Sequence, residues 1–469
     1  MDLLDLSRWQ MAITLVFHMT FPAITVGLSV FVCVLYGMYW RTGSAVYLQM
    51  FRFWRRIFAV GFALGVVSGI VVTFELGLNW GIFAAQTGPI EGPLLGMEVV
   101  TAFFVEAGFI GLLLYGDGRI GRATMFAASV MVSIGTLLST FWIMGNNSWM
   151  QTPSGFVFRN GRFEPTNWID IIFNPSFLWR FAHMLDALVV SAGFLVAGIG
   201  AYYLVKGNAL PFARRSVSIG LGIAAIALPL QLYLGDAVAG RIDFVYQLTK
   251  VEAMEGDWTG GNTGWLVFAI PDQQAQRNIV QISIPCLGSA FDKDLTCQTA
   301  NPGLNNTPPA DQPTVAPVFW GFRVMWYGSV LLFGTLFYVT ILRFRRKLWS
   351  ATGFHRFLMW STPLGIIALL AGWVIAETGR QPWVVFGQLR TSEAVSQLAP
   401  GELVFSVVGF SLLYLLMLVA YIAFIVRAMR IGPERDYPER DCPLQPVLDT
   451  APMASVNGAG RPMSEVRVN

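Results

Sequence analysis

The chain has 469 residues, of which 55% are hydrophobic and 13% are charged, and its mean hydropathy is +0.56. Soluble domains carry roughly 25% charged residues, so this composition excludes an ordinary soluble enzyme and a disordered chain. The 31 Lys and Arg residues barely exceed the 28 Asp and Glu residues, which argues against a nucleic-acid partner. The expected surroundings are a lipid bilayer.

Apolar runs of about 20 residues, long enough to cross about 30 Å of hydrocarbon, occur nine times in the sequence. They predict an all-α, polytopic membrane protein with nine transmembrane helices. The runs centre on residues 11–39, 54–77, 94–115, 123–145, 178–205, 216–238, 319–342, 355–376 and 403–426.

The distribution of Lys and Arg among the connecting segments predicts how these helices are oriented. Basic residues gather after the first, third, fifth and seventh runs, whereas residues 78–93 after the second run contain none. Because cytoplasmic loops carry the excess of Lys and Arg, the N-terminus is expected outside and the C-terminus in the cytoplasm.

Four regions follow from this topology. Residues 1–238 hold the first six helices, 239–318 form a polar extracytoplasmic loop, 319–430 hold the last three helices, and 431–469 form a cytoplasmic tail expected to be disordered. A loop of this length is usually functional or disordered. Two of the four cysteines, Cys286 and Cys297, lie in it on the oxidising side, where either a disulfide or two free thiols is compatible with the sequence.

Ionisable side chains at membrane depth cost several kcal/mol, so each one is a candidate functional residue. His18 and His183 lie in the first and fifth runs, where an imidazole can serve as a hydrogen-bond partner, proton relay or metal ligand. Met325 lies at a depth comparable to that of His183, and a His/Met pair can hold a haem iron. Arg323 can then neutralise a haem propionate. Core filling is the simpler interpretation of Met325 by itself.

Carboxylates form a second group of candidates. Glu98 and Glu106 are eight residues apart, which in an α-helix is about 12 Å of rise and about 80° of rotation, so both can face one interior line. Glu75 and Glu377 lie near the ends of their runs, where a solvated interfacial anion is the simple alternative. We likewise interpret His355 as a cation at the cytoplasmic interface.

Seven motifs, in order along nearly the whole chain, together resemble subunit I of the cytochrome bd family of quinol oxidases. They are Gln10–His18, Gly77–Trp80, Glu98–Glu106, Asn147–Pro153, Phe181–His183, Phe322–Met325 and Gly379–Trp383.

The resemblance implies a terminal oxidase of the bacterial cytoplasmic membrane. Such an oxidase takes electrons from ubiquinol or menaquinol at the outer face and reduces O2 to water with cytoplasmic protons, which contributes to the proton motive force. Its large subunit carries a low-spin haem b, a high-spin haem b and haem d. It works with a second large membrane subunit, and the number of small accessory subunits is left open.

The resemblance also assigns haem ligands. His183 and Met325 correspond to the axial pair of the low-spin haem b, and His18 to a ligand of a high-spin haem. Glu98 and Glu377 correspond to residues at the two high-spin irons, without showing which iron belongs to haem d. The segment Gly379–Trp383, which includes Arg380, is similar to the segment that caps the haem region in this family, and Trp373 is well placed to contact a porphyrin.

The remaining assignments concern protons and quinol. Glu106 and Ser139 resemble the end of a proton path to the oxygen site. The segment Gln247–Trp258 is similar to the quinol-binding loop of the short-loop branch, and Lys250 and Glu255 match its lysine and glutamate.

Two other functions remain open from the residues alone. A proton-coupled secondary transporter also places carboxylates near the midplane, although the sequence shows no internal repeat of the kind common in transporters. A dihaem cytochrome b without oxygen chemistry would not need Glu98 and Glu106.

Overall fold

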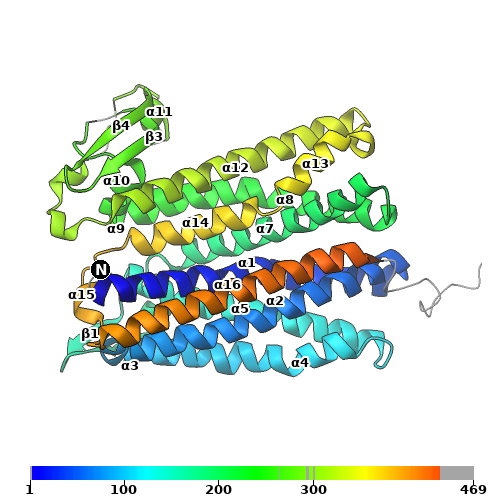
Figure 1. Cartoon of the computed structure of the whole chain (residues 1–469), viewed down its shortest axis with the longest axis horizontal. Coiled ribbons are helices and arrows are strands. Elements are labelled where there is room, and N and C mark those ends of the chain that lie inside the picture. Colours follow the sequence, from blue (N-terminus) through cyan, green and yellow to red (C-terminus); the bar gives the residue numbers. More distant parts are fainter. Residues whose placement is uncertain (1–2, 262, 292–294, 299–301, 434–469) are drawn as a thin grey trace, which may run out of the picture.

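Nine long apolar helices form the body of the part of the chain that the structure describes (Figure 1). The structure is a computed structural model that describes residues 3–261, 263–291, 295–298 and 302–433. The predicted all-α membrane fold with nine spans is confirmed. Most of the predicted cytoplasmic tail lies outside the described residues.

Each span extends beyond the apolar run that predicted it, because its ends include polar residues that carry the helix past the hydrocarbon. The spans are α1 (Leu3–Thr42), α2 (Ala45–Leu78), α3 (Gly81–Glu98) continued by η1 (Val99–Phe103) and α4 (Phe104–Tyr115), α5 (Arg122–Gln151), α7 (Phe177–Lys206), α8 (Leu210–Val238) continued by η2 (Ala239–Asp243) and α9 (Phe244–Tyr246), α12 (Val315–Phe344), α13 (Thr352–Trp360) with α14 (Leu364–Thr378), and α16 (Pro400–Ile431).

Helices α1 and α7 form the centre of the bundle, and α16 lies at its edge. In the most apolar stretch of each helix, 78% of α7 and 67% of α1 are buried, against 11% of α16. Small residues let α7 and α8 pack closely. A Cβ added at Gly220 of α8 would lie 2.4 Å from the backbone oxygen of Gly193 in α7, so the two backbones touch there.

Short elements cap the end of the bundle at which the N-terminus lies (Figure 1). Antiparallel strands β1 (Phe156–Arg159) and β2 (Arg162–Pro165) form one hairpin, and β5 (Trp383–Val385) pairs with β6 (Leu389–Arg390). Helices α6 (Trp168–Ile172) and α15 (Thr391–Ala394) complete this cap.

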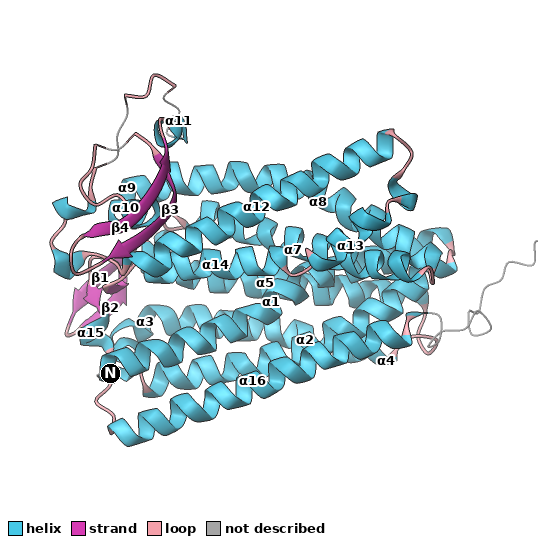
Figure 2. Ribbon diagram, turned by 45° about the horizontal axis from the view of Figure 1, so that its top comes forward, coloured by secondary structure: helices cyan, strands magenta, loops and turns pink. Residues whose placement is uncertain are grey.

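The long polar loop has its own secondary structure at the same end (Figure 2). It contains α10 (Leu248–Glu255), the antiparallel strands β3 (Trp265–Asp272) and β4 (Arg277–Ile284), α11 (Leu287–Phe291), and the 3-10 turns η3 (Leu304–Asn306) and η4 (Pro309–Asp311). Its buried side chains, among them Val251 and Leu266, join a cluster with Val318 and Phe319 of α12. The loop is therefore packed onto the bundle.

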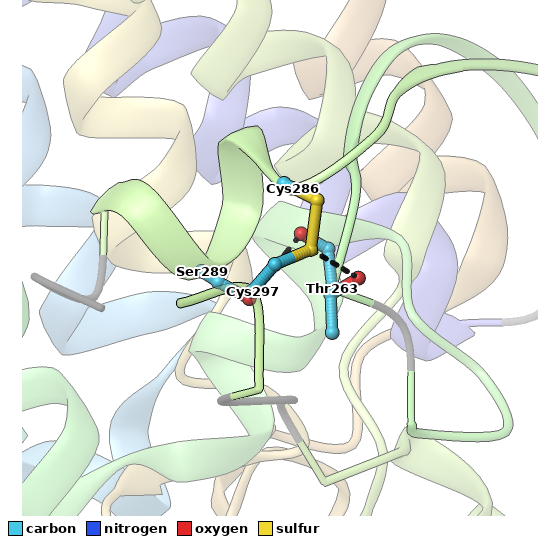
Figure 3. Close-up of a disulfide and its surroundings, with 4 residues drawn as sticks. All are labelled: Thr263, Cys286, Ser289 and Cys297. Atoms are coloured by element: carbon cyan, nitrogen blue, oxygen red, sulfur yellow. Dashed lines mark hydrogen bonds between the residues drawn. A yellow bond between two sulfur atoms is a disulfide. The ribbon is translucent and has the colours of Figure 1, made fainter. Parts of the chain in front are cut away.

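A disulfide joins Cys286 and Cys297 within this loop (Figure 3). The sulfur of Cys297 also lies 3.5 Å from the hydroxyl oxygen of Thr263, just before β3. Of the two states that the sequence left open, the structure has the bridge, which ties the segment after α11 to the residue between β4 and α11.

Candidate functional site

Two carboxylates, the partly buried Glu98 and the buried Glu106, face the same side of α5. The hydroxyl of Ser139 donates a 2.8 Å hydrogen bond to Oε1 of Glu98. One turn earlier, a Cβ on Gly135 would lie 2.4 Å from Cγ of Glu106, so Glu106 occupies the space that a larger residue would fill. The structure thus brings Glu98 and Glu106, both on the third span, against α5, which carries Ser139.

A π-turn between the carboxylates changes the geometry that the sequence predicted. The prediction of about 80° of rotation assumed a continuous α-helix, but Val99–Phe103 form a π-helix. A π-turn accommodates one extra residue, so eight residues rotate about as far as seven in an α-helix, within about 20° of two full turns. Glu98 and Glu106 therefore lie nearly one above the other, more closely aligned than the sequence indicated.

A second polar network joins α5, α7 and the end of α14. Asn147 donates a 2.7 Å bond to Oε1 of Glu377, and Arg180 donates a 2.8 Å bond to the side-chain oxygen of Asn147. Arg380 donates a 2.5 Å bond to Oε2 of Glu377. The Glu377 carboxylate is therefore held by Asn147 and Arg380, and its side chain is 23% exposed.

Each predicted haem ligand of the His and Met type lies against a glycine of a neighbouring helix. A Cβ on Gly69 of α2 would lie 3.2 Å from Cε1 of His18, and one on Gly235 of α8 would lie 3.2 Å from Cε1 of His183. The sulfur of Met325 has the same relation, at 3.4 Å, to Gly372 of α14. These glycines leave room beside all three side chains.

The two histidines also have polar neighbours. Nδ1 of His18 lies 3.0 Å from the hydroxyl of Ser68. Nε2 of His183 lies 3.4 Å from Nε2 of Gln231, while its Nδ1 is buried without a partner. His183 therefore keeps its Nδ1 available for another group.

Lys250 of the loop is 1% exposed and is surrounded by oxygen atoms. Its Nζ donates to Oε1 of Gln151 at 3.1 Å, to Oδ1 of Asp243 at 3.2 Å and to the side-chain oxygen of Gln247. Burial lowers the pKa of Lys250 to about 8, although the nearby Asp243 carboxylate opposes this shift. A Cβ on Gly379 would lie 2.5 Å from Cγ of Lys250, so this glycine makes room for the lysine.

Glu255 and Arg323 meet on the other side of α10. Nη2 of Arg323 lies 3.5 Å from Oε2 of Glu255. The same guanidinium is fully buried and donates to the backbone oxygens of Leu266 and Met254. The structure therefore does not bring Lys250 and Glu255 to one point, and the hydrogen-bond and ion-pair partners of Arg323 belong to the loop. Its predicted role at a haem propionate stays a prediction.

Comparison with known proteins identifies the family. The profile described as cytochrome bd terminal oxidase subunit I matches residues 6–433. The chain belongs to this family. It is 31% identical to the cytochrome bd-II ubiquinol oxidase subunit 1 of Escherichia coli (strain K12), over 92% of this chain and 97% of that protein.

Two further matches agree with this assignment. The chain is 30% identical to the cytochrome bd ubiquinol oxidase subunit 1 of Bacillus subtilis (strain 168), over 93% of this chain and 95% of that one. The solved structure of bd oxidase from Geobacillus thermodenitrificans superposes with a TM-score of 0.84 at 28% identity, covering 92% of this chain and 99% of the other. The predicted resemblance is confirmed, and the transporter alternative loses its support.

Cytochrome bd oxidases carry haem, and the buried groups of this chain fit such a cofactor. Arg380 keeps Nε and Nη1 without partners, and Arg180 keeps Nε, which suits anionic propionates. The indole nitrogen of Trp373 is also buried and unpartnered. Across the described ranges no three His, Cys, Asp or Glu side chains converge on a possible metal-ion site.

Several polar residues of this cytochrome bd subunit escape sequence reasoning. Glu91 is buried between two prolines of α3, is bonded by Asn146 and has an unpartnered Oε1. It lies three residues before the apolar run that predicted this span, so the sequence places it in a loop. Sequence reasoning also misses Asp243 and Gln247, because both lie in the polar segment 239–318.

Two interpretations from the sequence are corrected by burial. Glu75 is 3% exposed and accepts bonds from Thr14 at 2.6 Å and Gln10 at 3.3 Å, both on α1. His355 is buried as well. Neither is a solvated interfacial ion, because helices distant in the sequence cover both.

Proposed function

We propose that this chain is the haem-carrying subunit of a quinol oxidase in the bacterial cytoplasmic membrane. It oxidises quinol at the outer face, reduces O2 to water with protons from the cytoplasm and so contributes to the proton motive force. It works beside a second large membrane subunit. The observation that carries the proposal is that His18, His183 and Met325 each lie against a glycine of a neighbouring helix, within a chain that matches the oxidase family almost throughout.

The cofactors in this proposal are a low-spin haem b, a high-spin haem b and haem d. When bound, haem supplies one-electron redox centres and the iron at which O2 is reduced. His183 and Met325 would hold the low-spin haem, His18 a high-spin haem, and Glu98 and Glu377 would lie at the two high-spin irons.

Arg380 and Arg180 are the best-placed partners for propionates, because both are buried and both keep unpartnered N–H groups. Trp373 of α14 contributes a partly buried indole whose nitrogen is buried without a partner. These three side chains hold the cofactor in place and exclude water from it.

The aligned carboxylates supply the protons. Glu106 receives a proton from the cytoplasmic side and passes it toward Glu98, which lies farther along the same span. The hydroxyl of Ser139 holds Oε1 of Glu98 in place. Gly135 lets Glu106 approach α5 closely, so both carboxylates stay on one path.

The loop supplies the quinol site. Arg323 fixes the loop backbone to α12 and holds Glu255 in an ion pair. Lys250 contributes a cation at the junction of the loop with α5 and η2. Quinol placed here would give up its protons at the outer face.

One preparation tests the proposal. The complex of this chain with its partner subunit is purified, its dithionite-reduced spectrum is recorded, and oxygen consumption with quinol is measured. We expect b-type bands, an additional far-red chlorin band and quinol-dependent oxygen uptake. Bands of b type alone would indicate a dihaem cytochrome without oxygen chemistry, and a colourless complex would reject every haem assignment.

A further inference from the structure

The loop helix α10 carries a second acidic residue, Glu252, which the proposed function does not use. Its side chain is 2% exposed, and its Oε2 is buried without a hydrogen-bond partner. Leaving a buried carboxylate oxygen unbonded costs free energy. Such a group in a substrate-binding loop calls for a role.

The two neighbours of Glu252 on α10 are already engaged. The three protons of Lys250 meet three oxygens, on Gln151, Asp243 and Gln247. Glu255 pairs with Arg323, and this ion pair stabilises its negative charge. Neither residue is therefore well suited to take up a proton, whereas Glu252 has a free oxygen atom.

The position of Glu252 puts it beside the proposed quinol residue. Residues three apart on a helix have Cβ atoms about 5–6 Å apart, so Glu252 lies next to Glu255 on the surface of α10. Burial raises the pKa of Glu252 to about 7, and the nearby Asp257 adds to this shift. A base with a pKa near the working pH is the most effective proton acceptor.

We propose that Glu252 accepts the protons that quinol releases when it is oxidised at this loop. The inference rests on the proposed function. Oxidation of one quinol breaks two O–H bonds and releases two electrons and two protons. The electrons pass to the redox centres of the oxidase, where those from two quinols reduce one O2 to two waters. Each proton passes in turn to Oε2 of Glu252 and then to the outer solution.

Other charges near α10 bear on the pH dependence of this step. Helices α12, η2 and α9 and the turn η3 pack against α10. The titratable and charged groups on α10, just after it and on these elements near the loop are Lys250, Glu255, Asp257, Arg323, Tyr327, Arg241, Asp243 and Tyr246. Burial lowers the pKa of Lys250 to about 8, so its proton is lost above the range in which Glu252 acts.

The test compares two electron donors in the purified complex. Glu252→Gln keeps the shape of the side chain but removes the base. We expect kcat for quinol to fall about 100-fold, the size of a general-base contribution, with little change in KM. Oxidation of reduced tetramethylphenylenediamine, a one-electron donor that releases no proton, should continue at the wild-type rate.

The pH profile gives a second readout. In the wild type, quinol turnover should rise with pH through about 7 as Glu252 loses its proton. The Glu252→Gln variant should lack this rise, and Glu252→Asp should restore part of it. Glu402→Gln, which changes an exposed carboxylate at the start of α16, is the matched control and should behave like the wild type.

The possible results separate the two proposals. If wild-type complex oxidises the diamine but not quinol, the proposed quinol function fails. If wild-type complex oxidises quinol and Glu252→Gln does so equally fast with the same pH rise, this inference alone is overturned. Equal loss of both donor rates in Glu252→Gln also overturns it, because the carboxylate would then serve assembly.

Discussion

The role of Met325, as a haem ligand or as core filler, can be decided by substituting it. The core-filling and haem-ligand interpretations both fit a partly buried methionine beside Gly372. If Met325 is an axial ligand, Met325→Ala should convert the low-spin haem to a high-spin form. Met359 is also partly buried but lies on α13 in another cluster, so Met359→Ala is the control. A reduced optical spectrum that is unaltered in Met325→Ala would identify the residue as core filler.

At Gly135 we expect substitution by alanine to destabilise the protein, which is the opposite of its usual effect in a helix. Replacing a helical glycine by alanine normally stabilises a helix by about 1 kcal/mol. At Gly135 the new Cβ would lie 2.4 Å from Cγ of Glu106 and 3.2 Å from the backbone oxygen of Ala102. Overpacking of this kind costs about 1–3 kcal/mol, and Glu106 must also move, so both unfolding temperature and oxygen consumption should fall.

Gly108 is the matched position for this experiment. It lies on α4, and a Cβ there would have no neighbour within 4 Å. Gly108→Ala should leave turnover unchanged and the unfolding temperature equal or higher. If Gly135→Ala behaves in the same way, Glu106 does not depend on its close approach to α5.

At the scale of an element, the π-turn at Val99–Phe103 sets the relation between Glu98 and Glu106. Deleting Val100, whose side chain is exposed, would let the turn become α-helical. The seven residues that remain then rotate about as far as the eight of the present span, so Glu98 and Glu106 should stay aligned. We expect oxygen consumption and the helix content measured by circular dichroism to be retained in the deletion variant. Val100→Ala keeps the π-turn and should also remain active, and loss of oxygen consumption in the deletion variant alone would show that the π-turn does more than align the two carboxylates.

Arg323 holds the backbone of the polar loop in place. Its fork of donors binds the backbone oxygens of Leu266 and Met254, on either side of the turn between α10 and β3. Lysine cannot reproduce this geometry, and each buried carbonyl left unbonded costs about 1–3 kcal/mol. In Arg323→Lys, limited proteolysis should therefore cut the loop faster than in the wild type. A change in the haem spectrum with unaltered proteolysis would instead support the propionate role predicted from the sequence.

Across the whole molecule, the features that the sequence predicts correctly are those that depend on local composition, above all the membrane spans. Long apolar runs are sufficient to find all nine spans, because lipid tolerates few alternatives to a helix. The burial of Glu75 depends on Gln10 and Thr14, and that of Lys250 on Gln151. These partners are 61 to 99 residues away, and no local pattern connects them. The π-turn was equally hidden, because its apolar residues suit an α-helix as well.

The orientation of the whole bundle is a prediction that thiol labelling can check. The excess of Lys and Arg after the odd-numbered spans places the polar loop outside and the turn after α7 inside. Asn305 in the loop and Asn208 after α7 are both exposed, so Asn305→Cys and Asn208→Cys form a matched pair. A membrane-impermeant maleimide added to intact cells should label Asn305→Cys above the background of the parent chain but leave Asn208→Cys unlabelled. Permeabilised cells should label both, and the opposite pattern in intact cells would invert the proposed sides for quinol oxidation and proton uptake.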